Sequence, residues 1–133
     1  MPLPPAIRWS PGFGQALALA IIGLVACGGQ PSNRFVTVTV TFRLAEAGAL
    51  TATPAGVHVD WPSAVTVELV NYDGQAHGLQ FTQLHLDTVV GAGAEASPSV
   101  AYYALDIRGP GTFAWRCSLN CGDRPPEGYV HVA

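Results

Sequence analysis

Apolar and polar residues alternate along several stretches of the chain after residue 34. In residues 35–44 (FVTVTVTFRL) every second side chain is apolar, and threonine or arginine stands at most of the positions between. Residues 65–69 (VTVEL) and residues 101–107, with Ala101, Tyr103, Leu105 and Ile107, follow the same rule. Because side chains point alternately to the two faces of a strand, these stretches predict half-buried β-strands.

Shorter stretches predict the remaining strands. We expect one strand over residues 51–60, with His58 outward between two valines, and an apolar alternation over residues 84–90 with His85 and Asp87 on the other side. Residues 129–132 predict a last strand in which His131 faces out. Pro, Asn, Asp and Gly mark turns between these stretches. About seven short strands at roughly ten-residue spacing, with no helical period after Cys27, indicate an all-β sandwich.

Two cysteines and one histidine are the side chains most suited to chemistry. Residues 111–117 (GTFAWRC) place Cys117 on the same apolar face as two aromatic residues, and a tight turn over residues 118–120 brings Cys121 back beside it. His77 shares its face with Leu79 and Phe81, so its imidazole points toward the core. Two cysteines held in this way suit either a soft metal or a disulfide.

The beginning of the chain indicates export. Residues 16–26 (ALALAIIGLVA) form an uncharged apolar run of 11 residues, which is short for a membrane span of about 20 and typical of a secretion signal. The alternative is a buried hydrophobic helix. Residues 24–27 (LVAC) resemble a bacterial lipobox, which implies that Cys27 is lipidated and becomes the first residue of the mature protein. We therefore predict a signal peptide over residues 1–26, a lipidated tether over 27–34 and one domain over 35–133, anchored at the periplasmic or extracellular face of the cell envelope.

Composition and charge narrow the function. A chain of 133 residues is long enough for one ordinary domain, and part of its 49% hydrophobic content lies in the signal segment. Without Arg8, five arginines remain against nine acidic residues, a net charge of −4, and lysine is absent. The sequence has no basic patch for nucleic acid, no phosphate-binding loop and no nucleophile paired with a base. We therefore expect a metal-binding or electron-transfer protein rather than an enzyme.

Two segments resemble cupredoxins. Residues 117–122 (CSLNCG) match the start of the copper A loop of cytochrome c oxidase subunit II, Cys-Ser-x-x-Cys-Gly-x-x-His-x-x-Met, and residues 111–113 (GTF) resemble the strand that leads into the cupredoxin loop. Residues 71–81 resemble the Asn-x-Asp-x-x-x-His-x-x-x-Phe segment that carries the first histidine ligand. The resemblance covers roughly residues 51–132 and implies a Greek-key β-sandwich of the cupredoxin kind.

The resemblance also implies a ligand set, which is incomplete. It makes His77 the first histidine ligand, Cys117 and Cys121 the thiolates, and Leu119 the donor of a backbone carbonyl. Pro125 and Gly128 stand where the second histidine and the methionine would be. Nearby carboxylates could supply oxygen, a poor ligand for Cu(I). We therefore expect at most one copper ion per chain.

Three functions remain open. The first is an envelope lipoprotein that binds copper for electron transfer or copper delivery, in contact with a redox protein, a terminal oxidase or a copper-handling protein. The second is a metal-free accessory subunit of a membrane complex, with Cys117 and Cys121 joined in a disulfide. The third is a thiol–disulfide reagent, although three residues separate these cysteines whereas two are typical of such enzymes.

Overall fold

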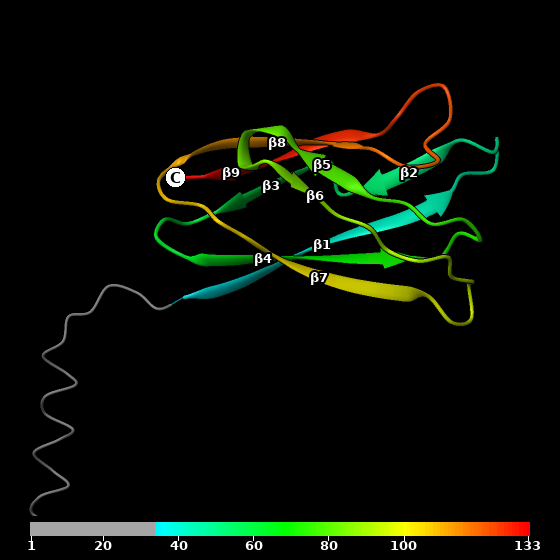
Figure 1. Cartoon of the computed structure of the whole chain (residues 1–133), viewed down its shortest axis with the longest axis horizontal. Coiled ribbons are helices and arrows are strands. Elements are labelled where there is room, and N and C mark those ends of the chain that lie inside the picture. The colour runs from blue at the N-terminus through cyan, green and yellow to red at the C-terminus, as the bar shows by residue number, and fades with distance from the viewer. Residues whose placement is uncertain (1–33) are drawn as a thin grey trace, which may run out of the picture. The chain divides into compact units, whose positions relative to one another are not determined.

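A computed structural model describes residues 34–133 of the chain as a β-sandwich (Figure 1). The predicted signal peptide, the predicted lipidation of Cys27 and most of the predicted tether lie outside these residues. Within the described part no helix is long and apolar enough to cross a membrane. The elements, in chain order, are β1 Phe35–Leu44, β2 Leu50–Thr53, β3 Gly56–Val59, β4 Ala64–Asn71, β5 Leu79–Phe81, the 3₁₀ turn η2 Thr82–Leu84, β6 Leu86–Asp87, β7 Ser99–Leu105, β8 Gly111–Cys117 and β9 Glu127–Val132.

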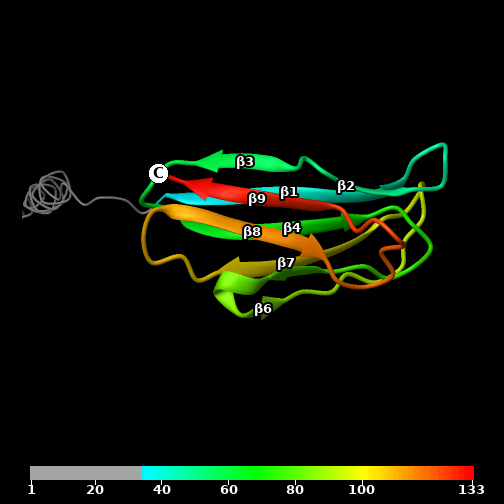
Figure 2. The same ribbon diagram turned by 90° about the horizontal axis from the view of Figure 1, so that it is seen from above.

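The strands form two sheets, and each contains one parallel pair. The first sheet has the order β2-β1-β4-β7, with β1 parallel to β4 and the other neighbours antiparallel. The second has the order β3-β9-β8-β5-β6, with β3 parallel to β9. Figure 2 shows β3, β9 and β8 side by side in the second layer. The predicted all-β sandwich is confirmed.

The apolar residues of the alternating stretches form the core between the two sheets. Val38, Val40 and Phe42 of β1 are at most 3% exposed, and the polar residues between them face outward. Trp115 and Cys117 of β8 meet this core from the second sheet, as the shared face predicted. Burial of these apolar side chains is the main force that holds the two layers together, since each removes its surface from water.

Two predicted strands are wrong in their extent. Residues 51–60 are not one strand: β2 pairs with β1 in the first sheet, and β3 pairs with β9 in the second. Pro54 lies in the short link where the chain passes from the first sheet to the second. It is outside both strands, so its missing N–H removes no strand-pairing hydrogen bond. In residues 84–90 only Leu86 and Asp87 form a strand, because η2 and a left-handed His85 precede them. The chain therefore has nine strands in its described part instead of about seven.

Candidate functional site

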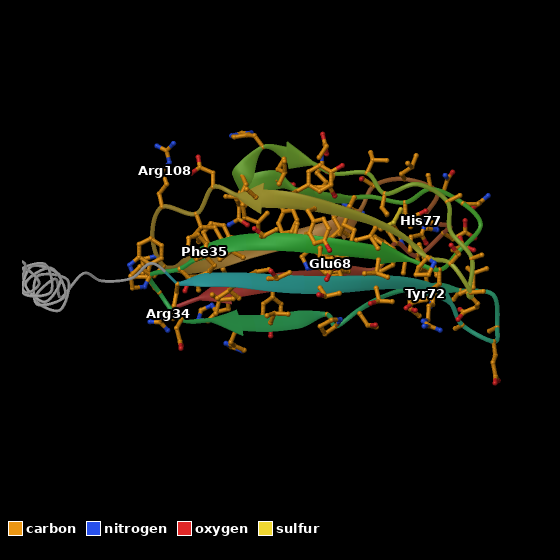
Figure 3. The ribbon with its side chains drawn as sticks, turned by 90° about the horizontal axis from the view of Figure 1, so that it is seen from below. Arg34, Phe35, Glu68, Tyr72, His77 and Arg108 are labelled. Atoms are coloured by element: carbon orange, nitrogen blue, oxygen red, sulfur yellow. A yellow bond between two sulfur atoms is a disulfide. The ribbon has the colours of Figure 1, made fainter. Side chains whose placement is uncertain are left out.

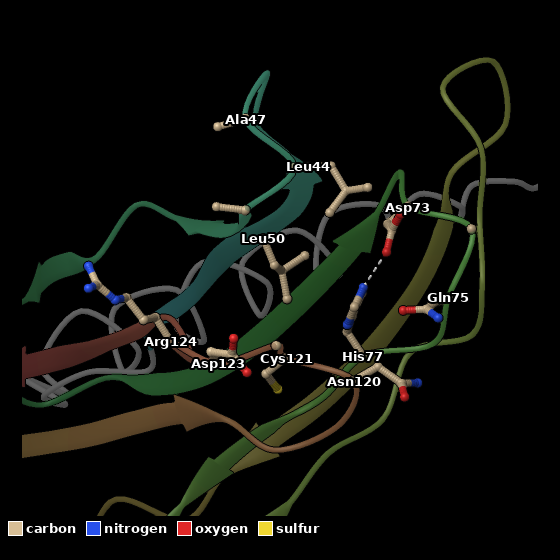
Figure 4. A pocket seen from close by; sticks show the side chains of 14 residues that line it. Leu44, Ala47, Leu50, Asp73, Gln75, His77, Asn120, Cys121, Asp123 and Arg124 are labelled. Atoms are coloured by element: carbon tan, nitrogen blue, oxygen red, sulfur yellow. Dashed lines mark hydrogen bonds and ion pairs between the residues drawn. The ribbon is translucent and has the colours of Figure 1, made fainter.

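The loops at one end of the sandwich enclose an open pocket of about 870 Å³. Its walls come from the turn after β1, from residues 73–77 between β4 and β5, and from residues 120–124 between β8 and β9 (Figure 4). His77 lies at this end, and Arg34, where the described chain begins, lies at the other (Figure 3). Three segments distant in sequence therefore supply one site.

Asn71 at the end of β4 shapes the loop that carries His77. Its side chain is fully buried, and its Nδ2 donates to the carbonyls of Gln75 and Gly91 at 2.8 and 2.9 Å. Its Oδ1 accepts from the backbone N–H of Asp73 at 2.9 Å, which forms an Asx turn. The resulting loop directs Asp73 and His77 toward each other.

His77 is 1% exposed, and both of its ring nitrogens face oxygen atoms. Nδ1 lies 3.0 Å from the carbonyl oxygen of Leu119, and Nε2 lies 2.7 Å from Oδ2 of Asp73. The ring also stacks on Phe42, with centroids 5.2 Å apart and planes 21° from parallel. The prediction that His77 points into the core is confirmed.

These contacts satisfy both nitrogens of the buried His77 ring. A carbonyl oxygen can only accept, so Nδ1 of His77 carries a proton and donates it to Leu119. Oδ2 of Asp73 lies within hydrogen-bond distance of Nε2, on the other side of the ring. Both ring nitrogens therefore have an oxygen partner, and His77 is satisfied as a buried polar residue.

The loop after β8 is closed by a disulfide between Cys117 and Cys121, whose Cα atoms are 5.9 Å apart. The tight turn predicted over residues 118–120 does bring the two cysteines together. The backbone N–H of Cys117 donates to the carbonyl of Pro126 at 2.9 Å, and that of Ser118 donates to Gly78 at 3.0 Å. The loop is therefore hydrogen-bonded both to the residue just before β9 and to the segment that carries His77.

Two of the predicted ligands, His77 and Cys117, approach the carbonyl oxygen of the third, Leu119. Nδ1 of His77 lies 3.0 Å from this oxygen, and Sγ of Cys117 lies 3.7 Å from it. Cys121 lines the same pocket as His77. Within residues 34–133, however, no three side chains of His, Cys, Asp or Glu gather as a ready metal site. That these residues bind copper stays a prediction.

The two vacant motif positions have a structural explanation. Gly128 lies inside β9 opposite Trp115, and a Cβ atom there would overlap the Trp115 ring and the carbonyl oxygen of Ala55. A methionine side chain has no room at this position. Pro125 lies in the loop that returns to β9 and has no donor atom in its side chain.

Three residues that support His77 were not among the predicted site residues. Asp73 holds Nε2, Phe42 stacks on the ring, and Asn120 donates from Nδ2 to the carbonyl of Ala76 at 2.9 Å. For Asp73 a signal was present, since it stands four residues before His77 in the segment that resembles cupredoxins. Phe42 gave no such signal because it looks like any other inward residue of β1.

Comparison with solved structures identifies the architecture. Rusticyanin from Thiobacillus ferrooxidans aligns with 77% of this chain and 79% of its own, at 13% identity and a TM-score of 0.55. The copper nitrite reductase of Nitrosomonas europaea aligns with 74% of this chain and 41% of its own, at 21% identity and a TM-score of 0.55. Auracyanin A, a blue copper protein from Chloroflexus aurantiacus, aligns with 74% and 99%, at 12% identity and a TM-score of 0.50.

The described domain has the cupredoxin fold. No protein-family model matches the sequence, and no curated protein matches it. The cupredoxin resemblance expected from residues 71–81 and 111–122 is confirmed at the level of the fold. The closer likeness of the Cys117 loop to copper A of cytochrome c oxidase subunit II stays a prediction from the motif.

Proposed function

We propose that this cupredoxin-fold protein binds one Cu(I) ion at the cell envelope when Cys117 and Cys121 are reduced, for copper delivery or electron transfer. Thiolates are preferred protein ligands of Cu(I). The loop after β8 already holds the sulfur atoms of Cys117 and Cys121 next to each other at the edge of the core. When the cysteines are oxidised, the disulfide replaces the metal. The protein would therefore exchange copper according to the redox state of this pair.

The observation that carries the proposal is the arrangement of His77. Nδ1 faces the Cys117 loop, and Asp73 holds the opposite nitrogen. Metal-binding histidines commonly donate their other ring N–H to a carboxylate, which fixes the tautomer and orients the ring. Loss of the Nδ1 proton, with Nε2–H kept on Asp73, would make His77 a third ligand beside the two thiolates. Leu119 would then offer its carbonyl to the same ion.

The redox step balances without a further cofactor. Two electrons and two protons convert the Cys117–Cys121 disulfide into two thiols, and a dithiol protein of the envelope is the class of reductant required. Binding of the ion then releases the thiol protons. A donor set without a second histidine or a methionine supports one ion only, because Gly128 and Pro125 supply no ligand atoms.

Reductive loading of the full-length chain tests the proposal. The reduced protein is loaded anaerobically with Cu(I), dialysed, and assayed for metal and for optical and EPR signals. We expect one copper per chain, no EPR signal and no intense visible band. The double variant Cys117→Ser/Cys121→Ser should lose that copper, and subtraction of its residual metal removes any held by Cys27. The variant His85→Ala, which changes an exposed histidine, should bind as the parent does.

Two results would contradict the proposal. Two coppers with an intense visible band would mean that a second set of ligands completes a copper A centre. No retained copper, with rapid closure of the disulfide, would favour the metal-free accessory subunit. Two observations support that second function. The cysteines are joined in a disulfide, and both ring nitrogens of His77 have hydrogen-bond partners within the protein.

A further inference from the structure

Two histidines lie side by side on the outer face of the second sheet. His58 of β3 and His131 of β9 are direct partners in the parallel pairing of these strands, which Figure 2 shows next to each other. Their ring centroids are 5.2 Å apart, and their planes are 72° from parallel. Both side chains point away from the core, since Val59, Val130 and Val132 are the buried residues that alternate with them.

The separation of the two rings suits a shared metal ion. Imidazole nitrogens bind zinc at about 2.0–2.1 Å, and two such rings on one tetrahedral ion have centroids about 5 Å apart. The observed 5.2 Å agrees with this spacing without any movement of the strands. Because β3 and β9 are held in register by their ladder, the two rings are brought together by backbone pairing and not by a flexible loop.

Thr112 of β8 orients one of the two rings. Its Oγ1 lies 2.6 Å from Nδ1 of His131, directly across the β8–β9 ladder. When Nδ1–H donates to this hydroxyl, the lone pair of Nε2 is free for a metal. A hydrogen bond of this kind to the non-coordinating nitrogen is the usual support of a metal-binding histidine.

Within residues 34–133 no charged side chain holds the two rings in place. Neither histidine forms an ion pair with a carboxylate of the described chain, and the only further ring near His58 is Tyr129, edge-on at 6.3 Å.

We infer that His58 and His131 form a surface site for a divalent transition metal, with Cu(II) preferred over Zn(II). Imidazole suits both ions, and a given nitrogen site generally binds Cu(II) more tightly. Water would complete the coordination. The site needs no cysteine. It also lies far from the Cys117 loop, because Thr112 and Cys117 stand five residues apart on β8, about 17 Å along the strand.

Titration of the oxidised full-length chain with Cu(II) tests the inference. The Cys117–Cys121 disulfide is kept intact, and any free thiol is alkylated, so that the cysteines do not contribute. We expect calorimetry to give one Cu(II) per chain, with an EPR spectrum that shows two coordinated imidazole nitrogens. His58→Ala and His131→Ala should each weaken binding by at least about tenfold, and Thr112→Val should weaken it by on the order of tenfold.

The controls separate this site from other copper ligands. His85→Ala, which removes a lone exposed histidine, should leave the affinity unchanged. Cys117→Ser/Cys121→Ser should keep Cu(II) binding, and the His58→Ala/His131→Ala double variant should keep Cu(I) binding by the reduced chain, so the two proposals can fail separately. An equal loss in His85→Ala, or an unchanged affinity in folded His58→Ala and His131→Ala proteins, would overturn the inference.

Discussion

At the scale of single residues, the candidate site depends on a buried histidine, His77, whose two ring nitrogens both have a hydrogen-bond partner. His77 is almost fully inaccessible to water, and Asp73 beside it has a side chain that is only 10% exposed. A buried polar group is costly unless it is hydrogen-bonded, so each partner of this imidazole stabilises the native loop. The Asp73 carboxylate is the stronger partner, since a charged acceptor makes a shorter and stronger hydrogen bond than a carbonyl.

Replacement of Asp73 should therefore reduce stability. In Asp73→Ala the Nε2 atom of His77 loses its acceptor while the ring stays buried, and we expect the free energy of unfolding to fall by about 1–3 kcal/mol. Urea unfolding followed by tryptophan fluorescence measures the change. Asp123→Ala is the matched control, because Asp123 lines the same pocket but is exposed, and its loss should change stability by about 0.5 kcal/mol or less. Equal unfolding midpoints for the two variants would contradict this account of the pair.

At the scale of elements, β8 and β9 decide what the copper-like loop can hold. The ladder that pairs Trp115 with Gly128 extends to Arg116 and Glu127, next to Cys117, so the position of the motif's methionine lies in a strand and not in the loop. Gly128 lies under the Trp115 ring, against the carbonyl of Ala55 before β3. The same packing that holds the sheet together thus removes the space for a methionine ligand.

A side chain at position 128 should strain this packing. In Gly128→Ala the new methyl group would overlap Trp115 and the backbone of Ala55, and we expect a loss of about 1–3 kcal/mol in the free energy of unfolding. Gly74→Ala is the control, because a Cβ at position 74 meets nothing within 4 Å and its backbone is not left-handed. Thermal unfolding of both variants measures the difference. A Gly128→Ala protein as stable as the parent would show that the strand pair can open at this position.

At the scale of the whole molecule, the first described residue and the candidate site lie at opposite ends of the sandwich (Figure 3). Arg34 lies at the end of the domain opposite His77 (Figure 3). If Cys27 is lipidated, the tether joins the domain at the end remote from the pocket.

The anchor itself can be tested in cells. We predict that the protein fractionates with membranes as a mature chain that begins at an acylated Cys27, because an apolar run of 11 residues ends at the lipobox-like residues 24–27. Mass spectrometry of the membrane fraction measures the N-terminus and its modification, and Cys27→Ser should lose both the acyl group and the fractionation. A soluble protein that begins at another residue, or one that keeps Met1, would be incompatible with the prediction.

The local alternation of apolar and polar residues was enough to predict the fold class and the direction of several side chains. It predicted the sandwich, the buried face of β1, the inward direction of His77 and Cys117 and the outward direction of His58 and His131. It could do so because the direction of a side chain on a strand depends only on its neighbours in sequence. The extent of the strands near Pro54 and His85 was wrong, since there the partner strand, and not the local pattern, decides where pairing ends.

Contacts across the fold were decided only by the tertiary structure. The carbonyl oxygen of Leu119, 42 residues from His77 in sequence, is the hydrogen-bond partner of Nδ1. The two cysteines form a disulfide, where the sequence allowed either a disulfide or a metal site. The register of β3 against β9 sets His58 beside His131, although nothing in either strand alone pairs them. Strand order and register depend on how all the faces pack at once, and that packing determines which side chains meet.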